Sequence, residues 1–303
     1  MKIKNASRIN KILILGASVI GILFLVLITL NLDLFLRLFH AYQNSKLTWE
    51  VVQYEIASYN IKAPFPLIPD RSKVSPNDGM SQIYIPAGEF IMGNGDDLTA
   101  DNPQHRVYVD SYWMDKLEIT NAMYAKCFNA HVCTHPAQYD TYYDNWAYRD
   151  YPVVYVNWYQ ADQYCHWAGR SLPSEAQWEK AARGTDGRRY PWGNQTPNPR
   201  LANFNFSLIG EPVPVFRYPL GASPYGVLNM AGNVREWIAD WYDENYYQSS
   251  PYADPLGPAS GTQRSLRSGS YAEDQQQISV YTRFKHLPDS AGLSRGFRCD
   301  EFQ

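Results

Sequence analysis

The nine-residue stretch NMAGNVREW, from Asn229 to Trp237, places one carboxylate, that of Glu236, between an arginine and a tryptophan. The stretch is too polar for a buried strand, and its Asn and Gly residues disfavour the start of a helix. Asn and Gly are the residues that most readily adopt the left-handed conformations of tight turns. The pattern therefore indicates either an ordinary turn or a loop whose oxygen atoms converge on a bound group.

Cysteine and histidine are the other residue types that could carry chemistry. No C-x-x-C pair occurs, which argues against a zinc ribbon or a thioredoxin-type site. His131 and His135 flank Cys133 at i, i+4 spacing, but the segment ends in Pro136 and is typical of a loop, so it is a weak metal candidate. A nucleophile elbow, a phosphate-binding Gly loop and a zincin motif are also missing. Outside the loop at 229–237, the sequence offers no standard catalytic motif.

The N-terminus predicts a membrane anchor. Residues 1–11 carry four basic and no acidic side chains, and residues 12–32 carry no charge at all. As a helix that run would be roughly 32 Å long, enough to cross the hydrocarbon core of a bilayer. No small-residue cleavage site follows, which favours an uncleaved anchor over a cleaved signal peptide. We expect a cytoplasmic tail (1–11), a transmembrane anchor in lipid (12–36), a stalk (37–82) and a periplasmic or extracellular domain (83–303).

Composition predicts a loop-rich domain with an aromatic core. The chain contains 24 Tyr, 9 Trp and 12 Phe among its 303 residues, with 19 Gly and 20 Pro. Such a mixture suits a core filled by large rings rather than by long amphipathic helices. The net charge of −3 gives no indication of a nucleic-acid partner. An even number of cysteines in an exported domain indicates two disulfides, with four free buried thiols as the alternative.

Few regular elements are expected, and the fold class is α+β. One helix should span residues 157–169 and end at a glycine. A second should begin after Ser174, where Gln177 completes a capping-box pattern, and end before Gly184. A third should follow Thr120 as its N-cap. The stretch from His105 to Met114 is typical of a strand.

Several segments resemble the formylglycine-generating enzyme (sulfatase-modifying factor) domain family. They occur in the family's order over residues 83–303: AGEFIMGNGDDLTADNPQHRVYVDSYWMDKLEITNAMYAKC, YPVVYVNWYQADQYCHWAGRSLPSEAQWEKAARG, RRYPWGN, YGVLNMAGNVREWIADWY, LRSGSY and RGFRC. The resemblance implies a variant of the C-type lectin fold with little regular secondary structure, preceded here by one transmembrane helix. It also implies a disulfide between Cys165 and Cys299, which leaves Cys127 and Cys133 to pair with each other.

The resemblance further implies that the loop at 229–237 binds calcium. Its ligands would be the Asn229 side chain, the Gly232 and Val234 carbonyls and the Glu236 carboxylate, all of them hard oxygen atoms. The alternative is a metal-free turn in which the carboxylate pairs with an arginine, because an unpaired buried charge is costly.

A second family calcium site would begin at Asn203, through its side chain, and Phe204, through its carbonyl. We do not identify the expected acidic residue downstream in SLIGEPVPVFRYP, which leaves this second site in doubt.

The family's catalysts oxidise a sulfatase cysteine with a copper-binding pair of cysteines just after GSY. The matching segment here, from Ser268 to His286, contains Glu273 and Asp274 but no cysteine. Carboxylates cannot replace the soft thiolates that copper(I) requires. Related iron-dependent members draw histidines from an upstream domain, where this chain has only its predicted anchor and stalk. We therefore expect neither copper nor iron.

These observations favour a non-catalytic binding or scaffold protein, such as an accessory subunit of a membrane complex that contacts another membrane or surface protein. The expected contact surface is the aromatic segment at 138–152, with Tyr139, Tyr142, Tyr143, Trp146 and Tyr148. Two alternatives remain. One is an oxidoreductase that acts on cysteine or sulfur substrates through an altered site, and the other is a glycan- or ligand-binding surface receptor.

Overall fold

The computed structural model describes residues 71–95, 103–137 and 142–302, which belong to one compact unit, residues 63–303. The predicted tail, the predicted anchor at 12–36, most of the predicted stalk and Tyr139 lie outside the described residues. Among the described residues, no helix has the length and apolar character needed to span a bilayer.

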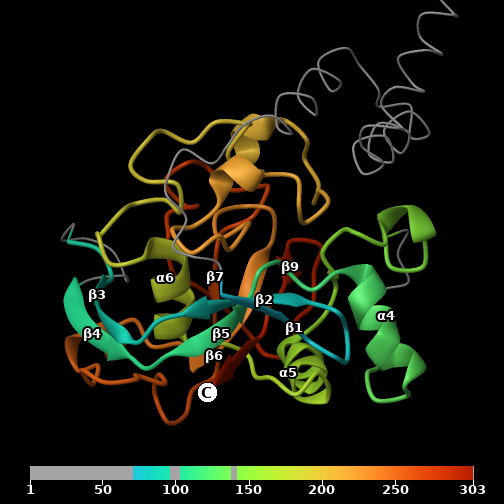
Figure 1. The fold of residues 1–303 in the computed structure, drawn as a ribbon, viewed down its shortest axis with the longest axis horizontal. Coiled ribbons are helices and arrows are strands. Elements are labelled where there is room, and N and C mark those ends of the chain that lie inside the picture. Colours follow the sequence, from blue (N-terminus) through green and yellow to red (C-terminus); the bar gives the residue numbers. More distant parts are fainter. Residues whose placement is uncertain (1–70, 96–102, 138–141, 303) are drawn as a thin grey trace, which may run out of the picture. The chain divides into compact units, whose positions relative to one another are not determined.

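The first and last strands of the described chain share one sheet (Figure 1). This antiparallel sheet has the order β1-β2-β5-β10, made of Ser72–Val74, Ser81–Ile85, Tyr112–Asp115 and Asp300–Phe302. Strand β1 falls within the range assigned to the stalk. The folded domain therefore begins upstream of residue 83.

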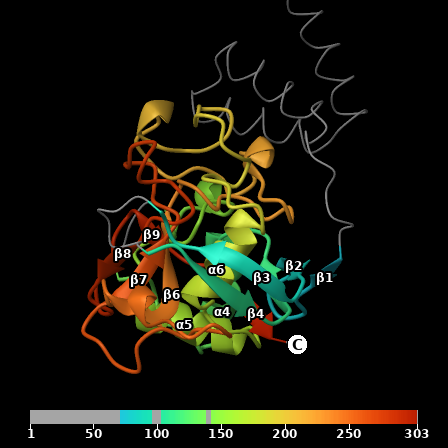
Figure 2. The ribbon, with the colours of Figure 1, turned by 90° about the vertical axis from the view of Figure 1, so that its left-hand side faces the viewer.

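Two further sheets complete the strand structure (Figure 2). One pairs β3 (Gly88–Met92) with β4 (His105–Val109). The other has the order β8-β7-β6-β9, made of Phe284–His286, Arg264–Arg267, Arg235–Trp241 and Arg295–Gly296, with β9 parallel to β6.

The single strand predicted over residues 105–114 is two strands, β4 and β5, in different sheets. The break falls at Asp110, whose backbone N–H donates to the Asp254 side chain instead of to a neighbouring strand. The partner at the break is thus an aspartate 144 residues further along the chain.

All three predicted helices are present. Helix α4 (Asn121–Asn129) is capped by the Thr120 side chain, α5 (Trp158–Trp167) by Asn157, and α6 (Glu175–Arg183) by Ser174. The capping box of α6 forms as expected, because Ser174 and Gln177 each accept the other's backbone N–H. Short 3₁₀ turns punctuate the loops: η1 Trp146–Tyr148, η2 Asn205–Ser207, η3 Pro219–Gly221 and η4 Tyr246–Gln248.

Helix α6 is buried along its whole length and contacts β3, β4, β6 and β7. Its charged side chains are paired: Arg267 donates to Glu175 and Glu179, at 3.0 and 2.6 Å. Lys180 donates to two backbone carbonyls, those of Gly88 and Val109. Each of these buried charges has a charged or polar partner, which offsets part of the free-energy cost of removing it from water. The same contacts hold the helix against two sheets.

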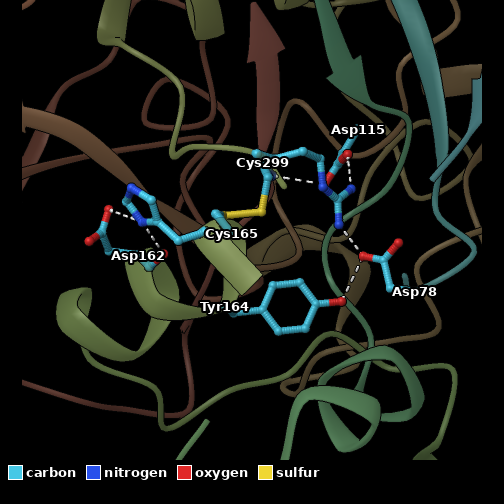
Figure 3. Close-up of a disulfide and its surroundings, with 8 residues drawn as sticks. Asp78, Asp115, Asp162, Tyr164, Cys165 and Cys299 are labelled. Atoms are coloured by element: carbon cyan, nitrogen blue, oxygen red, sulfur yellow. Dashed lines mark hydrogen bonds and ion pairs between the residues drawn. A yellow bond between two sulfur atoms is a disulfide. The ribbon is translucent and has the colours of Figure 1, made fainter. Parts of the chain in front are cut away.

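Both expected disulfides are present, Cys165–Cys299 and Cys127–Cys133. The first joins α5 to the C-terminal strand region (Figure 3). Close to it, the buried Arg170 guanidinium forms ion pairs with Asp78 and Asp115, both of which are also buried. These contacts fasten the chain's end onto the domain.

Candidate functional site

The segment after GSY, where the family's catalysts carry cysteines, contains a buried ion pair. Glu273 is buried, and one of its oxygens accepts a hydrogen bond from Arg235 on β6. Its other oxygen accepts the backbone N–H of Ser270. Ser268 and Gly269 have positive φ values of 80° and 69°, so the chain turns sharply before this carboxylate. A charged, hydrogen-bonded carboxylate thus lies in the segment where a redox pair would be expected.

No thiol is available near that pair. All four cysteines of the chain are described, and each is in a disulfide. A disulfide sulfur carries no thiolate charge and is not a copper(I) ligand of the required kind. The site as folded offers carboxylate, guanidinium and phenol groups.

The loop at 229–237 folds as tightly as its sequence indicates. Asn229, Gly232 and Asn233 have φ values of 55°, 82° and 63°. A Cβ at Gly232 would lie 2.2 Å from the backbone oxygen of Asn203, so only glycine fits there. The Ser268 hydroxyl donates to the carbonyls of Asn229 and Gly232, at 3.2 and 3.0 Å. The loop is thereby fixed to the segment that precedes GSY.

Glu236, the expected carboxylate ligand, is fully buried and paired inside the protein. Arg298 donates to both of its oxygens, each at 2.7 Å, and the Trp178 indole donates to one of them at 2.7 Å. This is the arginine pairing left open as the alternative. The burial of Glu236 therefore no longer argues by itself for a metal ion.

A second buried carboxylate, Glu118, was missed from the sequence. It accepts hydrogen bonds from the side-chain amides of Asn229, at 2.8 Å, and Asn233, at 2.9 and 3.1 Å. Burial, together with the neighbouring Glu236 carboxylate, raises the pKa of Glu118 to about 8. Glu118 is therefore largely protonated at neutral pH, and the Arg298 guanidinium balances the one remaining charge, that of the Glu236 carboxylate.

Both oxygens of Glu236, the carboxylate predicted to bind calcium, already accept hydrogen bonds from Arg298. The Gly232 carbonyl, another predicted ligand, is a hard oxygen donor that lies within hydrogen-bond distance of the Ser268 hydroxyl. Val234, the residue that follows Asn233 in this loop, is fully buried. Calcium binding at this loop stays a prediction.

Asn203, the start of the second predicted calcium site, is also buried and bonded. Its side-chain oxygen accepts from Ser207 at 2.7 Å, and its nitrogen donates to the Glu211 carbonyl at 2.9 Å. The Phe204 carbonyl accepts the backbone N–H of Ser207. The fold therefore brings an acidic residue, Glu211, next to Asn203, which the sequence pattern did not predict. Its carboxylate accepts the Tyr142 hydroxyl at 2.8 Å.

The predicted contact surface is only partly exposed. Trp146 is 74% exposed and lies near the guanidinium of Arg149, 5.4 Å from the ring centre. Tyr142 and Tyr148 are half-buried and pack against each other, with ring centres 4.6 Å apart. Tyr143 packs edge-on against other rings at the margin of the core. Of the described residues predicted for contact, Trp146 alone presents most of its surface to solvent.

The architecture and this site together define a domain of the formylglycine-generating type: little regular structure, a tight Asn- and Gly-containing loop, and a segment after GSY beside it. Residues 68–301 match the family described as the sulfatase-modifying factor enzyme 1-like domain. The chain therefore belongs to this family.

Relatives of several kinds share this domain. The formylglycine-generating enzyme of Streptomyces coelicolor is 32% identical over 286 aligned residues, which cover 74% of this chain and 90% of that enzyme. The serine/threonine-protein kinase Pkn1 of Chlamydia trachomatis is 33% identical over 249 residues, which cover 76% of this chain. This chain matches only 40% of the kinase's length. Hercynine oxygenase of Mycolicibacterium smegmatis is 29% identical over 235 residues, 63% of this chain and 54% of that enzyme.

Two solved structures share the fold. PvdO from Pseudomonas aeruginosa covers 78% of this chain and 99% of its own, with a TM-score of 0.67 and 22% identity. Variable protein 1 of Treponema denticola covers 77% of this chain and 99% of its own, with a TM-score of 0.64 and 22% identity. These likenesses confirm the formylglycine-generating-enzyme-like architecture expected from the sequence.

Proposed function

We propose that this protein is a membrane-anchored, outward-facing binding domain of the formylglycine-generating family that has no oxidase activity. It would act as an accessory subunit of a membrane protein complex. The anchor at 12–36 would hold the protein in the membrane, and the folded domain beyond it would contact a second membrane or surface protein.

The observation that carries this proposal is the ion pair between Glu273 and Arg235 in the segment after GSY. Copper(I) chemistry of the family's kind needs two thiolates there. This chain has a carboxylate held by a guanidinium and a backbone N–H, and its four cysteines are used in structural disulfides. The same segment is packed into the domain, where Ser268, Ser270 and Glu273 are buried.

The exposed Trp146 supports a contact function. Among the described residues, Trp146 is the one tryptophan in the group of exposed large hydrophobic side chains, at 74%, alongside Phe206 at 71% and Leu208 at 89%. The neighbouring tyrosines hold the segment in place: Tyr142 is bonded to Glu211, and Tyr148 packs between Tyr142 and Tyr151. A rigidly supported, exposed aromatic residue is the kind that contributes most to protein interfaces.

The test uses the full chain purified in mild detergent. Oxygen uptake is measured with a cysteine-containing sulfatase peptide and added copper, with the Streptomyces coelicolor enzyme as the positive control. We expect uptake no higher than that of a protein-free blank. Turnover of the peptide would refute the proposal in favour of the altered-site oxidoreductase.

The second arm identifies proteins that purify with the chain from its native membrane. We expect a stoichiometric partner whose capture falls when Trp146 is changed to Ala. A chain that runs alone at every detergent concentration would refute the subunit role.

A further inference from the structure

Two arginines occupy paired positions at one edge of the third sheet. Strands β6 and β9 are neighbours there (Figure 2), and Arg235 on β6 is in register with Arg295 on the parallel strand β9. Paired residues of neighbouring strands point to the same face, so these two like charges are neighbours. Both side chains are half-buried, that of Arg235 being 25% exposed. The pair is therefore partly desolvated yet still open to solvent.

The charges around this pair do not balance. Glu273 pairs with Arg235, whereas Arg295 has no carboxylate within ion-pair distance among the described residues. Burial, and next the charge of Arg235, lower the pKa of Arg295. The pKa of His286 is lowered by burial and then by the same two arginines, against the opposite effect of Asp289. The site as folded carries one surplus positive charge.

Most donors of the two guanidinium groups are not used by the described protein. Nη2 of Arg235 donates to Glu273, and Nη2 of Arg295 donates to the Ala291 carbonyl at 2.5 Å. Each guanidinium has five N–H groups, and no further hydrogen bond from either is found within the ranges that the structure describes. Capacity remains for a ligand that accepts several hydrogen bonds.

The surroundings hold both groups in place. The Arg235 guanidinium lies over the Phe284 ring, 4.4 Å from its centre. Arg295 lies against Gly292, where a Cβ would come within 2.5 Å of its Nη2 atom. The Phe284 ring against Arg235 and the Gly292 backbone against Arg295 limit the motion of the guanidinium groups before any ligand binds.

We propose that Arg235 and Arg295 form a binding site for a carboxylate, the acidic side chain of a protein partner. This rests on the proposed binding function. The single surplus charge matches a monoanion, whereas a doubly charged phosphate or sulfate would leave excess negative charge beside Glu273. A planar carboxylate also matches the fork of N–H donors that a guanidinium presents.

The test is protection of arginine side chains from phenylglyoxal, followed residue by residue by mass spectrometry on the full chain in detergent. The probes are the peptides acetyl-Gly-Glu-Gly-amide and acetyl-Gly-Gln-Gly-amide, at equal ionic strength. We expect the Glu peptide to slow modification of Arg295 and Arg235 saturably, by at least about threefold near saturation. The Gln peptide should leave both modification rates unchanged. The exposed Arg200 should be modified by phenylglyoxal at the same rate in the presence of either peptide.

Two variants and one further anion make the test decisive. Arg295→Gln should abolish the protection of Arg235, and Glu273→Gln should strengthen protection by removing the competing carboxylate. Thermal melts verify that each variant is folded. Protection by sulfate but not by the Glu peptide would overturn the assignment to a carboxylate.

Equal modification rates with and without the Glu peptide would overturn the site itself. A different result would refute the proposed function: turnover of the thiol peptide, or the absence of any partner. The two failures are therefore distinguishable.

Discussion

Arg298 is the side chain whose removal should perturb this domain most clearly. It is 0% exposed and donates four hydrogen bonds: two to Glu236, and one each to the carbonyls of Asp115 and Leu228. Changing Arg298 to Met keeps much of the apolar volume but removes the positive charge that is paired with Glu236. The Trp178 indole would remain as a neutral donor to that carboxylate.

The expected loss follows from the cost of a buried, unpaired charge. Removing one partner of a buried ion pair costs about 3–5 kcal/mol, because the other partner is left in the core without its counter-charge. Glu118 should add little to the loss at neutral pH, because burial and the neighbouring Glu236 carboxylate raise its pKa to about 8 and keep it largely protonated. For a domain of this size, a loss of about 4 kcal/mol lowers the melting temperature by roughly 8–16 °C.

Thermal melts followed by near-ultraviolet circular dichroism of the full chain measure the loss. Arg200→Met, at an exposed arginine, is the matched control and should change stability by less than about 0.5 kcal/mol. The double variant Arg298→Met with Glu236→Gln should recover much of the loss, because no charge is then left unpaired. Added calcium should also reduce the loss if the loop binds calcium as predicted.

The reasoning would be refuted if Arg298→Met stayed within about 1 kcal/mol of the unaltered protein at neutral pH. A deficit that the second substitution did not relieve would also contradict it, because the loss would then come from packing.

Three further predictions concern separate features of the domain. Burial and a neighbouring carboxylate raise the pKa of Glu118 from 4.5 to about 8, so its contribution to stability is complete below about pH 4.5 and is lost as the pH rises toward 8. Glu118→Gln should therefore flatten the fall of the melting temperature across that window, and an unchanged pH profile would contradict the assignment. Replacing Cys165 and Cys299 by Ala should cost about 4–5 kcal/mol in urea unfolding, because the bond closes a loop over a sequence separation of 134 residues; a cost below about 1 kcal/mol would show that this constraint is unimportant. Trp146→Ala should change the free energy of unfolding by less than about 0.5 kcal/mol while reducing partner capture, with Tyr159→Ala as an exposed aromatic control; equal capture by both variants would remove Trp146 from the interface.

Local sequence determined the elements whose causes lie within a few residues. The caps at Thr120 and Ser174 depend on a side chain and a backbone N–H three positions apart, so their helices were predictable. The lack of cysteine in the segment after GSY is likewise a property of composition. The disulfide between Cys165 and Cys299 was predictable only through the resemblance, because its partners are 134 residues apart.

Tertiary structure decided how the charges of the site are paired. Glu236 finds its guanidinium 62 residues away, and Glu118 reaches the amide of Asn229 across 111 residues. Arg295 becomes a neighbour of Arg235 because β9 lies parallel to β6 and places the two arginines in register. Electrostatic energy depends on distance in space and on burial, and neither quantity is written in the spacing of residues along a chain. The sequence by itself therefore identified the family and the missing thiols, whereas the folded chain alone shows which carboxylates are paired with arginines within the core and which arginine lacks a carboxylate partner among the described residues.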